Sequence, residues 1–207
     1  MNIFVLSEEP REAAQMMCDK HCSKMIVEAG QMLSTAHRML DGYMEKRLSK
    51  SGKRMVKYYV HNSGNMEEIL YKAVHHAHPC TVWTMASKAN YIWHYEHLLG
   101  LSDEFQLRYK KTHMTINKLK DILSTPPTNI PDIGLTEFPQ AMNHYPECKV
   151  EGNPVQAYRN YYHAAKEFAV WQKGRIAPYW WEGFKGYPLG VHNNRSRRRC
   201  IFRYTKR

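Results

Sequence analysis

Apolar residues recur at helical spacing along several stretches of the chain. The longest stretch runs from about Lys20 to Leu40. In an α-helix, which turns 100° per residue, seven of its apolar residues would lie on one face and its polar residues would form a separate stripe. Gly42 follows and is expected to end this helix. Similar spacing predicts further helices at about 13–18, 67–74, 81–101, 105–123 and 154–171. The pattern therefore predicts a mainly α-helical protein.

The segments between these helices have other patterns. The apolar run at 2–6 suits a strand or an extended arm, and 43–65 is basic and rich in Ser and Gly, as in a solvated loop or a phosphate-contacting insertion. Several prolines predict a long extended connection over 124–154. We therefore expect a single-domain helical bundle of five or six helices over 1–190, with a short N-terminal extended segment and long irregular loops. A basic C-terminal arm is expected at 191–207.

Composition narrows the class of protein. The 207 residues are 43% hydrophobic and 24% charged, which is ordinary for a globular domain with a sizeable core. The net charge of +11 favours a polyanionic partner, most commonly nucleic acid, although seven of the basic residues lie in the last 13 positions.

Three sequence features that are absent bear on the expected location of the protein and on the state of its cysteines. It has no run of about 18 apolar residues that could span a membrane and no signal-peptide pattern at its start, so we expect no membrane partner and a cytoplasmic location. The five cysteines form no CxxC pairs and are expected to be reduced and mostly buried.

The stretch Cys18–Glu28 concentrates ionisable residues on a helix that otherwise resembles core. Lys24 and Glu28 are four residues apart on one face, which is usual for an exposed ion pair. Alternatively, Asp19, His21, Lys24 and Glu28 line a cleft, where partial burial would shift their pKa values and allow proton transfer or covalent carbonyl chemistry. The spacing does not distinguish acid, base and nucleophile.

The twelve histidines raise the question of a metal site. Several cluster between His75 and His97. The pair His94 and His97 lacks the glutamate of a metalloprotease helix and any nearby cysteine pair, and Cys18, Cys22 and His21 are poorly spaced for joint ligation. We predict no metal and no cofactor.

A second group of residues is of the types that bind bases and phosphates. Large aromatic residues such as Trp83 usually pack in a core, but together with the net charge this group favours a nucleic-acid or nucleotide substrate. No phosphate-binding glycine loop or Gly-x-Ser-x-Gly motif is present, which argues against nucleotide-driven motors and common hydrolases. The candidate nucleic-acid-binding residues are Lys20, His78, Trp83, Asn90, Tyr91, Arg108, Lys111 and His113.

Short stretches along the chain form a familiar arrangement: Met1–Leu6, Ala13–Gln15, Cys18–His21, Lys24, Met25, Glu28, Gln31–Ala36, His78–Trp83, Ala89–Trp93, Phe138–Met142 and Ala157–Tyr162. Together they resemble a family of small phage proteins commonly labelled pyrimidine-dimer DNA glycosylase or endonuclease V-like. The resemblance covers most of residues 1–182 and excludes the basic tail. The similarity to endonuclease V itself is limited to the order of the matching features along the chain and to their residue types.

The resemblance implies a DNA glycosylase, with or without AP-lyase activity, acting on damaged or modified pyrimidines. An amine would form a Schiff base at C1′ of the sugar, either the N-terminal amine beside Asn2 or Lys24, while Glu28 or Asp19 stabilises positive charge and moves protons. Trp83 or Tyr91 would stack on an extruded base. Two alternatives stay open: an enzyme that modifies nucleotides or DNA bases without strand cleavage, and a non-catalytic phage DNA-binding protein.

Overall fold

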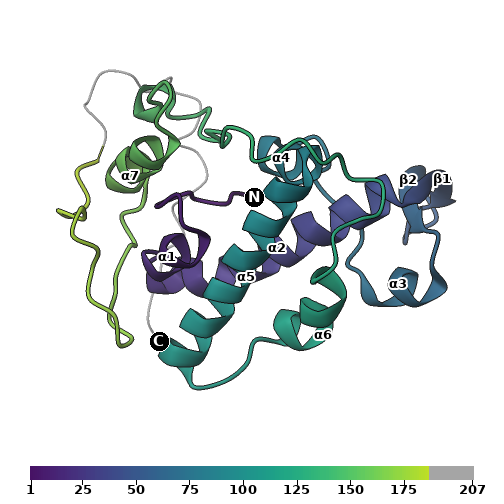
Figure 1. Ribbon diagram of the computed structural model, residues 1–207, viewed down its shortest axis with the longest axis horizontal. Helices are drawn as coiled ribbons and strands as arrows, with labels where there is room; N and C mark the ends of the chain where they lie inside the picture. The colour runs from purple at the N-terminus through teal and green to yellow at the C-terminus, as the bar shows by residue number, and fades with distance from the viewer. Residues whose placement is uncertain (187–207) are drawn as a thin grey trace.

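The protein is mainly helical, as its sequence predicts. The computed structural model describes residues 1–186, and in that range it has seven α-helices, rather than five or six, with one two-stranded antiparallel sheet and one short 3-10 helix (Figure 1). The elements are α1 (Pro10–Gln15), α2 (Asp19–Leu40), β1 (Gly42–Leu48), β2 (Met55–His61), α3 (Gly64–Ile69), α4 (Pro79–Ala86), α5 (Lys88–Tyr109), α6 (Met114–Leu123), η1 (Pro146–Cys148) and α7 (Pro154–Ala165).

The two long helices α2 and α5 cross at the centre of the molecule, and α1, α4 and α6 pack around them (Figure 1). The apolar face predicted for α2 is buried, including Met25, Ile26 and Leu33. Two glycines permit close helix contacts. A Cβ at Gly30 would lie 2.7 Å from the Thr115 side chain on α6, and one at Gly100 would lie 2.9 Å from that of Ala14 on α1.

The boundaries between residues 79 and 123 differ from those predicted. Instead of helices at 81–101 and 105–123, the chain forms α4, α5 and α6. Ser87 interrupts the first because its extended backbone and its Oγ, which accepts the amide N–H of Asn90, begin a new helix. Lys110 then ends α5 in the left-handed conformation (φ 57°).

The basic stretch predicted as a loop at 43–65 is largely a β-hairpin instead. β1 and β2 pair from Gly42 opposite His61 to Leu48 opposite Met55. β-branched and aromatic residues in β2 favour the extended conformation, and the hairpin projects from the C-terminal end of α2 (Figure 1). Buried Arg38 on α2 secures its base, since its guanidinium donates to the carbonyl of Tyr59 at 2.9 Å and also pairs with the Glu67 carboxylate.

The other short elements also depart from the predicted ranges. The helix predicted at 67–74 is α3 at 64–69, the last helix ends at 165 rather than 171, and the first is α1 at 10–15. Residues 2–6 form a buried arm that pairs with no strand of the described range 1–186, so of the two expected alternatives the arm is the one observed.

Several remaining expectations are resolved only in part. The connection 124–153 is irregular apart from η1. Within residues 1–186 the four cysteines are free and buried, and no helix there is long and apolar enough to cross a membrane. The predicted boundary at 190 and the basic arm at 191–207 lie outside the described residues.

Candidate active site at Glu28

Three nitrogen atoms converge on the carboxylate of Glu28, which lies midway along α2. The α-amine of Met1 is 3.6 Å from Oε2, the backbone N–H of Asn2 donates to the same oxygen at 2.9 Å, and Lys24 Nζ is 3.3 Å from Oε1. The Glu28 side chain is 12% exposed and that of Met1 4%, whereas that of Lys24 is 61% exposed. The predicted Lys24–Glu28 pair therefore exists, and the chain terminus adds a second amine to it.

The side chain of Asn2 holds the N-terminus in this position. Its Nδ2 donates to the carbonyl of Ala141 at 2.9 Å, and its Oδ1 accepts the amide N–H of Phe4 at 3.1 Å. Phe4 has a positive φ of 54°, a conformation that is uncommon for a bulky residue and that often occurs at functional sites. Asn2 thus contributes to the site through its backbone N–H and by positioning the terminus.

Lys166 is a third amine that interacts electrostatically with this carboxylate, and it is not among the residues predicted from the sequence. Its Nζ lies 4.0 Å from the ring centroid of Tyr161 and 5.2 Å from that of Phe4. Burial lowers the pKa of Lys166 to about 8, with the positive charge of Lys24 adding to the shift and the negative charge of Glu28 opposing it. The residue follows directly after α7, where no local pattern relates it to α2.

His78 lies at the edge of the same site. Its Nδ1 accepts the amide N–H of Cys80 at 3.2 Å and so caps α4. Burial lowers the pKa of His78, and the positive charges of the N-terminal amine and His75 lower it further, against the opposing effect of Glu28. His78 therefore has both a capping role and an electrostatic link to the terminus.

Asp19 and His21, which were predicted as catalytic, face the core instead. The Asp19 carboxylate accepts from Arg108 at 3.1 Å and from the amide N–H of Gln172 at 2.8 Å. His21 is 3% exposed, stacks on Phe4 at 4.4 Å and shares a hydrogen bond of 2.5 Å with the Tyr162 hydroxyl. Burial, followed by nearby lysines, lowers the pKa of His21 to about 3. Neither side chain reaches the Glu28 carboxylate by a direct contact.

Arg108 is likewise a core residue rather than a phosphate ligand. Its side chain is fully buried, and its guanidinium makes five hydrogen bonds, to Asp19, to Glu104 twice, and to the carbonyls of Met17 and Gln15. All five guanidinium N–H donors are thus used inside the protein.

Three further predicted nucleic-acid-binding residues are buried. Tyr91 is 0% exposed and its hydroxyl donates to the Leu123 carbonyl. Asn90 is also 0% exposed and its amide donates to the carbonyl of Trp83, which is itself 5% exposed and packs on Trp93. None of the three presents a face on which an extruded base could stack.

The other candidates are more accessible. Lys20 and Lys111 are exposed, and Lys20 Nζ lies 4.4 Å from the ring centroid of Phe168. His113 is half-buried and caps α6 by accepting the amide N–H of Thr115. Lys20 and Lys111 therefore remain available for phosphate contacts.

Comparison with known proteins adds no constraint on this site. No protein-family model, curated protein or solved structure matches the chain. The interpretation of the site therefore depends on its own geometry and chemistry.

Proposed function

We propose that this protein is a DNA base-excision enzyme, a glycosylase with AP-lyase activity that acts on damaged or modified pyrimidines. The observation that carries the proposal is the convergence of the Met1 α-amine, the Asn2 N–H and Lys24 Nζ on the Glu28 carboxylate. An amine beside a carboxylate is the pair that Schiff-base chemistry at a sugar carbon requires. The resemblance to the phage glycosylase-like family points to the same chemistry.

The proposed reaction begins when the neutral amine attacks C1′ of the target nucleotide. The bond from C1′ to the amine nitrogen forms, the glycosidic bond breaks, and the base leaves with the bonding electron pair and takes up a proton. Glu28 accepts the proton that the amine loses, and its negative charge stabilises the positive charge on the sugar. Opening of the sugar ring gives the Schiff base. Removal of a C2′ proton then breaks the C3′–O bond and cuts the strand.

The α-amine of Met1 is the favoured nucleophile. In a chain that begins at Met1, this amine lies beside a carboxylate that is 12% exposed, while Lys24 extends into solvent. Lys24 and Lys166 would then supply positive charge for the phosphate next to the target sugar.

The hairpin supplies a second surface suited to DNA. Its strands and tip carry exposed basic residues, and a two-stranded ribbon fits the major groove of a duplex. Gly42, where the hairpin begins, is 14 residues beyond Glu28, which is roughly 20 Å along the helix and therefore within one short duplex site. The exposed basic residues of the hairpin are Lys46, Arg47, Lys50, Lys53, Arg54 and Lys57.

Borohydride trapping tests the proposal. The full chain is mixed with duplexes that contain an abasic site or a pyrimidine dimer, and reduction is expected to give a covalent protein–DNA adduct. Glu28→Gln is expected to reduce adduct formation and strand cleavage by about 10²-fold or more, while salt-dependent DNA binding persists. Glu68→Gln, at an exposed glutamate, is the matched control and should behave as the unmodified protein.

Other outcomes would replace the proposal. DNA binding without any adduct, with base or nucleotide modification but no cleavage, would indicate the non-cleaving enzyme. Binding that Glu28→Gln leaves unchanged, with no chemistry on any of these substrates, would indicate a non-catalytic DNA-binding protein.

A further inference from the structure

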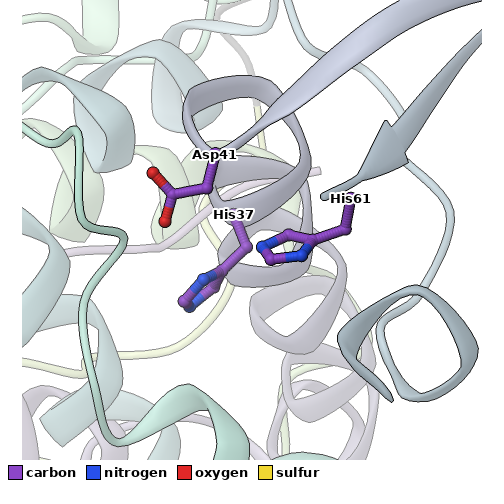
Figure 2. Close-up of side chains that lie close together, drawn as sticks. All are labelled: His37, Asp41 and His61. Atoms are coloured by element: carbon purple, nitrogen blue, oxygen red, sulfur yellow. The ribbon is translucent and has the colours of Figure 1, made fainter. Parts of the chain in front are cut away.

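We propose that His37, Asp41 and His61 form a binding site for one divalent transition-metal ion of the zinc class. His37 lies in the last turn of α2, Asp41 joins α2 to β1, and His61 ends β2. Figure 2 shows the three side chains lying close together, and one potential ligand atom from each lies within 4.8 Å of the others. Two histidines and a carboxylate are a ligand set typical of zinc and of non-haem iron.

His37 is held as a metal ligand would be. Its Nε2 is 2.8 Å from the Tyr91 hydroxyl, and that hydroxyl donates its own proton to the Leu123 carbonyl at 3.0 Å. The hydroxyl must therefore accept from His37, which puts the imidazole proton on Nε2 and leaves a lone pair on Nδ1. Nδ1 is buried and has no hydrogen-bond partner within residues 1–186. Metal-bound histidines characteristically donate their second ring N–H in this way.

His61 also presents a buried ring nitrogen without a partner. In the described part of the chain its Nε2 has no hydrogen bond, while its Nδ1 accepts the amide N–H of Ser63 at 3.0 Å. In the metal-free chain the proton is therefore on Nε2. Metal binding would use the Nε2 lone pair, the proton would move to Nδ1, and the Ser63 N–H would turn to solvent. Ser63 is exposed, so water can replace this contact.

Asp41 supplies the negative charge and is already fixed in orientation. Its two oxygens accept from the amide N–H groups of Thr128 and Asn129, at 2.6 and 2.9 Å, and from the Asn129 side chain at 2.9 Å. Three donors leave about one of its four lone-pair positions for a cation. Hydrogen bonds of this kind are usual for carboxylates that bind metals.

Without a metal, the cluster is costly to bury. Each of these two nitrogens is buried without a hydrogen-bond partner among the described residues, which costs solvation free energy, and the two ring centroids lie 6.2 Å apart. A metal ion would satisfy both and would join α2, the two hairpin strands and the loop at 128–129. His37 is nine residues beyond Glu28, roughly 13 Å along α2, so this site and the candidate active site are separate and can be tested independently.

Titration of the chelator-treated full chain with Zn²⁺ and Co²⁺, followed by calorimetry, tests the proposal. We expect one equivalent to bind and the thermal unfolding temperature to rise. His61→Ala and His37→Ala should each weaken binding by about tenfold or more, whereas His144→Ala, at an exposed histidine outside the cluster, should have no effect. Since His37 is in the core, His61→Ala at the hairpin end keeps the test interpretable if the other variant fails to fold.

Three results would overturn the proposal. The first is absence of saturable Zn²⁺ binding to the folded chain. The second is binding that both histidine substitutions leave unchanged, which would locate the metal elsewhere. The third is a Co²⁺ spectrum dominated by thiolate charge-transfer bands, which would locate the metal at cysteines.

Discussion

Replacing Arg108 with methionine distinguishes a structural arginine from a DNA-binding one. The substitution keeps an apolar side chain of similar length and removes the charge that faces Asp19 at 3.1 Å and Glu104 at 2.9 Å. Both carboxylates are nearly buried, and loss of one partner from a buried ion pair costs about 3–5 kcal/mol. Glu104 keeps Arg175 at 2.5 Å and Asp19 keeps the Gln172 N–H, so the lower half of that range is expected.

The assay is urea unfolding of the variant and the unmodified protein. Arg11→Met is the matched control, because Arg11 also pairs with two acids, Asp103 and Glu96, but its side chain is 49% exposed. That control should lose no more than about 1 kcal/mol. The reasoning fails if Arg108→Met unfolds within 1 kcal/mol of the unmodified protein, or if it stays stable and loses the salt dependence of DNA binding.

Three further predictions concern burial and packing. Burial lowers the folded-state pKa values of His97 and His21 from 6.5 to about 3. Protonation therefore favours the unfolded chain, and the free energy of unfolding should fall as pH drops below 6.5. The fall should be less steep in His97→Leu, which lacks one of the two histidines. Burial lowers the pKa of Lys166 to about 8 from 10.5, so stability should rise with pH between these values, a rise absent from Lys166→Met in the same urea series. Gly100→Ala places a Cβ 2.9 Å from Ala14 and should destabilise the protein by about 1–3 kcal/mol, measured by thermal unfolding.

Helix ranges are predicted best where the apolar spacing within the helix itself determines them. The apolar spacing from Met25 to Leu33 placed α2 within a residue of its observed range. Ser102–Glu104 lies between the helices predicted at 81–101 and 105–123, but it is inside α5. Leu101 and Phe105, four residues apart on one helical face, are both buried, so packing continues the helix through these polar residues.

The same distinction applies to the candidate site. Lys24 and Glu28 are one helical turn apart, so spacing alone could predict their contact. Met1 and Lys166 reach the site only through the folding of distant segments, and no period or motif relates them to Glu28. For Arg108 and Tyr91, residue type suggested nucleic-acid contacts, whereas burial assigns both to the core.

The most direct test of the central claim is to identify the amine that forms the trapped adduct. After borohydride reduction on abasic DNA, the protein is digested and the modified peptide is sequenced by mass spectrometry. We predict a reduced sugar on the α-amine of Met1, and loss of trapping when an N-terminal extension moves that amine away from Glu28. An adduct on Lys24 or Lys166, or trapping that the extension leaves unchanged, would contradict the account.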